Sequence, residues 1–131
     1  MIDYQAAVGR GFMQLSLDGV TIAQELTKKD VRLDGIVRRL IDLYRPDRIY
    51  LFGSKARGDF RPDSDYDLMV LLPDDAPPEL REGRLAYEAL WEMGVGADVL
   101  IWLRSDFERR AHVVASLPAT ILREGRLLYA A

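Results

Sequence analysis

IYLFGSKARGDFRPDSDYDLMVLL, the stretch from residue 49 to residue 72, consists of two apolar runs around a polar loop. The first run ends at Gly53, and a proline closes the second. Runs of this length that are rich in β-branched, aromatic and aliphatic residues and bounded by turn residues are typical of β-strands. The stretch therefore predicts strands over residues 49–52 and 67–72, with a loop over residues 54–64 between them.

Further elements are predicted on both sides of these two strands. Asp30 can cap a helix in which apolar residues recur at helical spacing until residue 44, and Pro46 ends that pattern. Residues 74–78 are predicted to be a linker. The remaining predicted elements are a helix over residues 79–93, a strand over 97–103, a helix over 105–117, a short helix over 118–123 and a last strand at 127–129. This alternation indicates an α+β fold, of the α/β two-layer kind, in which a small sheet is flanked by helices.

Length and composition narrow the class of protein. A chain of 131 residues can bury one core but not two, so residues 1–131 are expected to form a single domain. The apolar fraction of 49% and the charged fraction of 30% are those of a globular protein. The net charge of -3 argues against a nucleic-acid substrate, because such binding depends on lysine and arginine.

The absence of cysteine excludes disulfides and thiolate zinc sites and gives no support to an oxidising compartment. No uncharged span of membrane length and no basic stretch followed by an apolar run occur in the sequence. A cytoplasmic location without a membrane is therefore expected.

Three acidic residues open predicted strands. Asp65 and Asp67 are two positions apart at the start of a strand, and a period of two places both carboxylates on one face. Two such carboxylates repel each other unless a cation lies between them, and magnesium prefers carboxylate oxygens while keeping positions for water and phosphates. Asp98 opens the next strand and could reach the same cluster if the two strands are neighbours. A third carboxylate would permit a second metal ion or a general base.

Gly53 and Ser54 follow the first strand and are suited to a phosphate group. A glycine lets the backbone approach a phosphate closely, and the amides that open the following helical turn can donate to an anion. Lys55, Arg57 and Arg61 add positive charge nearby, and an arginine can bind a phosphate through two hydrogen bonds.

Each of these features has an ordinary structural explanation when it is taken alone. A Gly-Ser pair after a strand is commonly a turn, and an Asp-x-Asp beside Pro62 is commonly solvated turn chemistry. Their order and spacing favour one common site. Ser54, the pair Asp65 and Asp67, and the later isolated acid Asp98 follow one another along the chain in the order that such a site requires. Trp91 and Trp102 fall at apolar periodic positions and are predicted to pack in the core, although either could border a base pocket.

At these positions the sequence resembles the nucleotidyltransferase superfamily that includes DNA polymerase beta, in its minimal (MNT) branch. The resemblance is carried by LFGSKARG at residues 51–58 and SDYDL at residues 64–68. It implies a small mixed β-sheet, phosphate binding by the Gly-Ser pair, and two magnesium ions on the acidic pair with a third acid on a neighbouring strand. Carried over by position, the nucleotide-binding residues are Gly53 and Ser54, and the catalytic and metal-binding residues are Asp65, Asp67 and Asp98. Arg57 is expected to join the nucleotide-binding residues because of its charge.

The same resemblance divides the chain and implies a reaction. Residues 1–29 are expected to be an N-terminal helical extension, residues 30–103 the catalytic core, and residues 104–131 a C-terminal helix and short strand. The implied reaction transfers a nucleoside monophosphate, AMP from ATP, to a hydroxyl group.

The implied acceptor is a tyrosine of a HEPN-domain toxin, for which this chain would be the antitoxin within a homo- or hetero-oligomer. Transfer to a small molecule of the aminoglycoside type, for which Asp74, Asp75 and Glu79 could be imagined as an acidic pocket, remains an alternative. A non-catalytic antitoxin that neutralises its partner by binding is the other alternative.

Overall fold

The computed structural model describes residues 30–58 and 65–131. The predicted N-terminal helical extension over residues 1–29 lies outside the described residues, as do Arg61 and most of the predicted loop. In the described part of the chain, no helix is long and apolar enough to cross a membrane.

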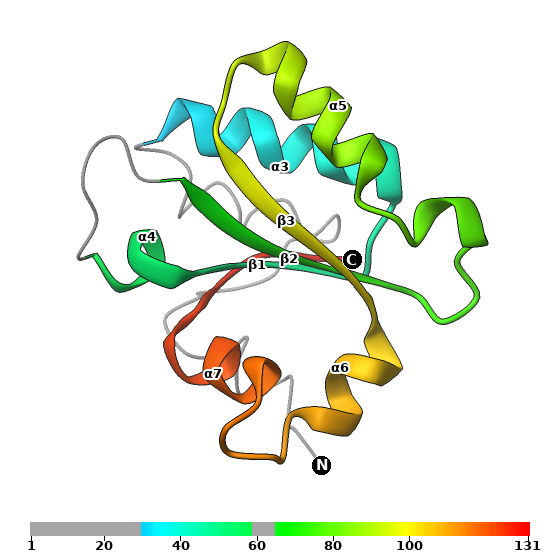
Figure 1. Cartoon of the computed structure of the whole chain (residues 1–131), viewed down its shortest axis with the longest axis vertical. Helices are drawn as coiled ribbons and strands as arrows, with labels where there is room; N and C mark the ends of the chain where they lie inside the picture. The colour runs from blue at the N-terminus through cyan, green and yellow to red at the C-terminus, as the bar shows by residue number, and fades with distance from the viewer. Residues whose placement is uncertain (1–29, 59–64) are drawn as a thin grey trace.

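A four-stranded mixed sheet forms the centre of the molecule (Figure 1). Its strands, in spatial order, are β3 (Ala97–Leu103), β2 (Tyr66–Leu72), β1 (Arg48–Phe52) and β4 (Arg126–Ala130). The β1 strand runs antiparallel to β2 and β4, whereas β2 and β3 run parallel. A parallel pair needs a crossover connection, and the helix between β2 and β3 provides it. The predicted small mixed sheet is confirmed.

Helices cover both faces of this sheet (Figure 1). The helices α3 (Val31–Tyr44) and α5 (Arg84–Met93) lie on one face, and α6 (Arg104–Arg110) and α7 (Leu117–Glu124) lie on the other. The sheet thus lies between two groups of helices, as expected for a small sheet flanked by helices. The second face is covered because the C-terminal segment forms two helices.

The alternation of strand side chains divides the core between the two faces. Leu68, Val70 and Leu72 of β2 pack with α3 and α5, whereas Met69 and Leu71 pack with α6 and α7. All five side chains are fully buried. Because successive strand residues point to opposite faces, the odd-numbered residues of β2, Asp67 included, face the α6 and α7 side.

Two predicted helix boundaries are wrong. The helix predicted over residues 79–93 begins only at Arg84, because a short 3-10 turn, η1 (Pro78–Leu80), comes before it. The helix predicted over residues 105–117 ends at Arg110. Ser116 stops a continuous helix: its hydroxyl donates to the Arg110 carbonyl at 2.7 Å and accepts from the Ala119 amide at 3.2 Å, and so caps α7.

Candidate active site

The structure brings Asp67 and Asp98 side by side. They are direct partners in the parallel ladder between β2 and β3, where neighbouring strands lie about 4.8 Å apart. Partners in a ladder point to the same face, so both carboxylates lie on the α6 and α7 side of the sheet. Asp67 is half-buried and Asp98 is exposed. Asp98 therefore occupies the neighbouring position that the sequence could only suggest.

Asp65 and Asp67 lean toward opposite sides of β2. A Cβ atom added to Gly53, which follows β1, would overlap the Asp67 Oδ2 atom and lie 3.1 Å from its Cγ atom. A Cβ atom added to Gly96, which precedes β3, would overlap the Asp65 Oδ1 atom. Each carboxylate therefore lies against a glycine that has no side chain to obstruct it. Gly96 is a site residue that the sequence analysis missed, although its position two residues before Asp98 could have indicated it.

The charges around Asp67 are unfavourable to its ionised form. Burial raises the pKa of the Asp67 carboxyl, and the negative charges of Asp98 and Asp65 raise that pKa further. The positive charge of Arg57 acts in the opposite direction. The three carboxylates thus repel one another, and a bound cation would reduce this repulsion.

The donor set of these carboxylates suits magnesium, but their present arrangement does not form a complete site. Within residues 30–58 and 65–131, no group of three or more acidic or histidine side chains is arranged to hold one metal ion. Asp65 lies against Gly96 instead. Magnesium needs only one or two carboxylates when phosphate oxygens and water supply its other ligands, and Asp67 and Asp98 meet that requirement.

Gly53 opens the short helix α4 (Gly53–Arg57) directly after β1. Its φ angle of 73° lies in the left-handed region, which favours glycine. Phe52, at the N-cap position, contributes no side-chain hydrogen bond, so that cap does not occupy the amides of the first turn. Phe52 is the ladder partner of Asp67, so α4 begins about one strand spacing from Asp67. The amides of its first turn and the Ser54 hydroxyl are therefore near that carboxylate.

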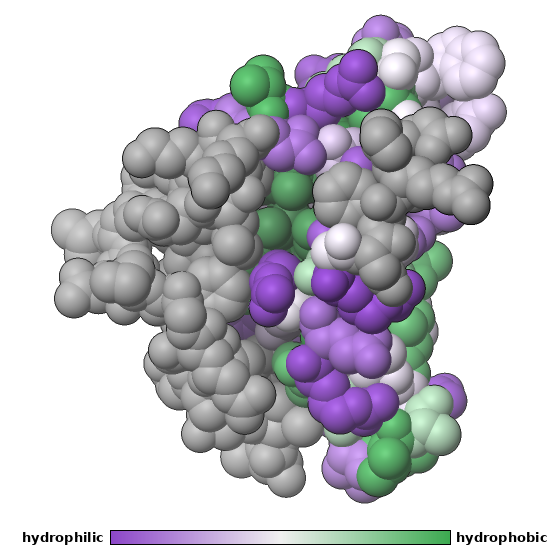
Figure 2. Space-filling model, turned by 90° about the vertical axis from the view of Figure 1, so that its left-hand side faces the viewer, coloured by the Kyte–Doolittle hydropathy of each residue, from purple (hydrophilic) through white to green (hydrophobic). Residues whose placement is uncertain are grey.

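The two basic residues of α4 have different surroundings. Arg57 is exposed, with its Nη1 atom 4.0 Å from the Glu124 Oε2 atom, and its charge reaches Asp67. The Lys55 Nζ atom lies 4.3 Å from the centre of the Tyr66 ring, a cation–π distance. Figure 2 views the molecule from the α4 side, where hydrophilic residues gather over the middle of the described surface.

Tyr66 ties the site to helix α3, a contact that the sequence analysis missed. Its hydroxyl donates to the Asp30 Oδ2 atom at 2.7 Å, while the Asp30 Oδ1 atom accepts from the Leu33 amide and caps α3. Burial and the hydrogen bond to Asp30 raise the pKa of Tyr66 to about 12, so the phenol remains a donor. Tyr66 lies between the two aspartates in sequence but points to the opposite face, where it holds β2 against α3.

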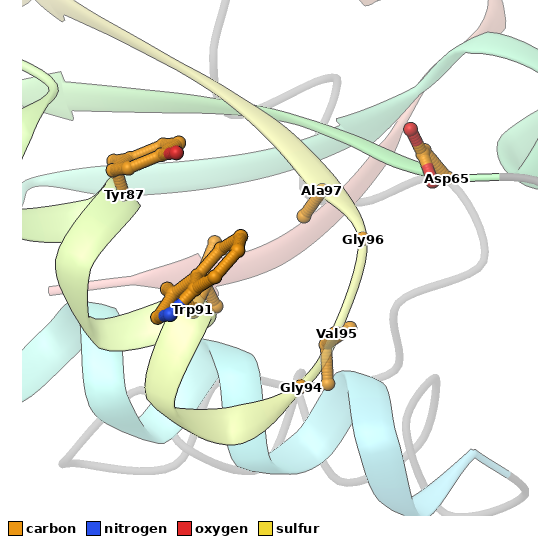
Figure 3. A pocket seen from close by; sticks show the side chains of 8 residues that line it. Asp65, Tyr87, Trp91, Gly94, Val95, Gly96 and Ala97 are labelled. Atoms are coloured by element: carbon orange, nitrogen blue, oxygen red, sulfur yellow. The ribbon is translucent and has the colours of Figure 1, made fainter.

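A pocket of about 510 Å³ lies next to Asp65, between α5 and the start of β3 (Figure 3). Tyr87 and Trp91 line one end of it, and Gly96 and Ala97 lie between them and Asp65. Trp91 is 76% exposed, so the prediction that it packs in the core is wrong. The core side of α5 is formed by its smaller apolar residues, which are Ala86, Ala89 and Leu90.

The nucleotidyltransferase domain family matches residues 33–128, a range that contains all of these strands except the end of β4. The chain belongs to this nucleotidyltransferase family. A search among curated proteins finds no match.

Solved structures are similar to this nucleotidyltransferase at low sequence identity, and the two with TM-scores above 0.5 share its fold. A putative nucleotidyltransferase from Sulfolobus solfataricus is 18% identical, with a TM-score of 0.52 over 83% of this chain and 87% of that one. A chain in the structure of a mutant of the toxin-antitoxin MntA-HpeT is 20% identical, with a TM-score of 0.51 over 75% and 73% of the two chains. A chain in the complex of the tri-AMPylated Shewanella oneidensis HEPN toxin with MNT antitoxin is 24% identical, with a TM-score of 0.45 over 82% and 73%.

Proposed function

We propose that this nucleotidyltransferase moves a nucleoside monophosphate from a nucleoside triphosphate to a hydroxyl group with the help of magnesium. The observation that carries the proposal is the placement of Asp67. Asp67 is the ladder partner of Asp98, and its carboxylate rests against Gly53, the first residue of the helix that would bind the phosphates. Metal-binding carboxylates and phosphate-binding amides would therefore meet at one point of the sheet.

The reaction would form a bond between the acceptor oxygen and the α-phosphorus and break the bond from that phosphorus to pyrophosphate. Gly53 and Ser54 would hold the leaving phosphates through backbone and hydroxyl donors, and Arg57 would add charge from the exposed side of α4. Positioning and electrostatic stabilisation supply most of the acceleration in such transfers.

Asp65, Asp67 and Asp98 would hold magnesium, which when bound neutralises charge on the transferred group. Asp65 has to turn away from Gly96 to join the other two carboxylates. Asp98 is exposed, as is Asp65, and it lies beside Asp67 in the ladder, so a carboxylate there can take the proton that leaves the acceptor hydroxyl.

We take ATP as the donor and a tyrosine of a HEPN-domain toxin as the acceptor, which would make this chain an antitoxin. Two observations support this choice. The motifs around Gly53 and Asp65 resemble the MNT branch, and the fold is shared with a chain of the toxin-antitoxin MntA-HpeT. A small-molecule acceptor is less well supported, because Asp74 already accepts a hydrogen bond from the Ser105 amide at 3.0 Å.

The first experiment combines the protein with ATP labelled at the α-phosphate, magnesium and the HEPN-domain protein, and detects label on protein. We expect transfer to fall by about 10²-fold or more in Asp65→Ala plus Asp67→Ala, because a lost metal ion removes several kcal/mol of transition-state charge stabilisation. Chelation of magnesium should abolish it in the wild type. Asp75→Ala, a change in an exposed turn at the other end of β2, is the matched control and should leave transfer unchanged.

The outcomes separate the three functions. Transfer that survives the double substitution would refute the metal-binding assignment of the aspartates. Label that appears on an added aminoglycoside and never on protein would refute the protein acceptor. If the doubly substituted protein still neutralised the toxin at full strength, neutralisation would be by binding and not by transfer.

A further inference from the structure

The pocket beside Asp65 has a lining that the proposed reaction does not explain. Tyr87 and Trp91 are one turn apart on α5, and their rings stack with centroids 6.3 Å apart. They are 69% and 76% exposed, so neither side chain stabilises the core. Figure 3 shows both rings projecting from α5 along the side of the molecule where β3 begins, with Asp65 beyond Gly96.

Such a pair is typical of a protein interface. Exposed aromatic side chains are unfavourable in water, and tyrosine and tryptophan are the residues that most often dominate binding between proteins. Stacking on one helix also pre-organises the two rings, which reduces the entropy that is lost when a partner binds. The described residues offer other exposed apolar side chains, such as Val114 at 77%, but that residue lies in the turn between α6 and α7 and does not line this pocket.

The position of the pocket relative to the phosphate-binding helix indicates which reactant it serves. The order across the sheet is β3, β2, β1, and α4 extends from β1. The pocket lies at the β3 side of the sheet, away from α4 in strand order, and on the face that α5 covers, whereas the carboxylates of Asp67 and Asp98 point to the other face. An occupant would reach Asp98 around the start of β3, where Gly96 has no side chain and Asp65 borders the pocket. In a transfer of this kind the attacking and leaving oxygens are roughly in line on opposite sides of the phosphorus. With pyrophosphate at α4, the acceptor has to approach from the β3 side.

We propose that this pocket is the docking site of the acceptor protein, with Tyr87 and Trp91 as its anchors. This inference rests on the proposed transfer to a protein. The partner would place an apolar side chain against the two rings, and its acceptor hydroxyl would then reach past Gly96 toward Asp98. The nucleobase of the donor is a poorer occupant, because a base held here would lie on the path of the in-line acceptor.

The test measures transfer to the HEPN-domain protein as a function of its concentration, with Trp91→Ala and Tyr87→Ala. For each variant we expect KM for the acceptor protein to rise about tenfold, as for an interface anchor, while kcat at saturation stays within about threefold. KM for ATP should not change. Val114→Ala is the matched control, because it also removes an exposed apolar side chain, and Trp91→Phe should restore much of the affinity.

Several results would overturn the docking site. An unchanged KM for the acceptor protein in both alanine variants would do so, and a raised KM for ATP would assign the pocket to the nucleobase instead. A wild type that sediments as a dimer and a Trp91→Ala variant that sediments as a monomer would assign it to a second copy of the chain. If the wild type labels no protein, the proposed transfer fails by itself. In that case, calorimetry measures the affinity of the wild type and of Trp91→Ala for the HEPN-domain protein. A lower affinity of Trp91→Ala supports the docking site, and an equal affinity refutes it.

Discussion

Gly53→Ala probes the contact between the phosphate-binding helix and Asp67. At a φ angle of 73°, an alanine costs about 1–2 kcal/mol, because Cβ comes too close to the following carbonyl oxygen. The added Cβ would also overlap the Asp67 carboxylate, which must swing away at a further cost of about 0.5–1.5 kcal/mol for an unfavourable rotamer. Alanine restricts the unfolded chain and returns about 0.4–1 kcal/mol. The net loss in the free energy of unfolding is about 2 kcal/mol.

This loss should lower Tm by roughly 6–8 °C, which calorimetry or circular dichroism can measure. Transfer of labelled AMP should fall by about 10²-fold, because a displacement of about 1 Å at a reacting centre has that effect. Gly58→Ala is the matched control. Gly58 also has a left-handed φ angle, 85°, but no atom of residues 30–58 and 65–131 lies within 4 Å of the Cβ that would be added. It should cost about 1 kcal/mol through backbone strain alone and leave transfer nearly unchanged.

A double-mutant cycle isolates the steric part of the effect. If the Asp67 carboxylate is what the new methyl group displaces, Gly53→Ala should cost about 1 kcal/mol less in an Asp67→Ala background than in the wild type. Equal stability losses in Gly53→Ala and Gly58→Ala, together with no coupling in the cycle, would refute the reasoning. Retention of full transfer by Gly53→Ala would show that the position of the Asp67 carboxylate is not critical.

Two further predictions concern stability. Because the folded state raises the pKa of Asp67, its ionisation destabilises the fold, and stability falls as pH rises from the ordinary carboxyl range through that raised pKa. Asp67→Asn should therefore gain about 0.5–1 kcal/mol in urea unfolding at pH 7 without magnesium, a gain that fades near pH 3, and a loss of stability at pH 7 would contradict this account. Tyr66→Phe should lose about 1 kcal/mol with its hydrogen bond to Asp30 and keep transfer within a few-fold, so that inactivity in a stable variant would point to a chemical role for the hydroxyl.

Sequence periodicity was sufficient for the features that lie within one element. The apolar runs around Gly53 and Asp67 predicted β1 and β2. The alternation of side chains along a strand is also seen in β2, where Tyr66 and Leu68 lie on the face opposite Asp67. The Asp30 cap of α3 was also predicted and is confirmed. These features depend on residues that are neighbours along the chain, where spacing alone determines which side chains share a face.

Features that depend on pairing between distant segments required the tertiary structure. The partnership of Asp67 with Asp98 follows from the parallel register of β2 and β3, which the sequence of neither strand specifies. The same holds for the packing of Asp65 against Gly96 and for the exposure of Trp91, whose helical spacing suited a core position equally well. Periodicity shows which residues share a face, but packing between elements decides what that face meets.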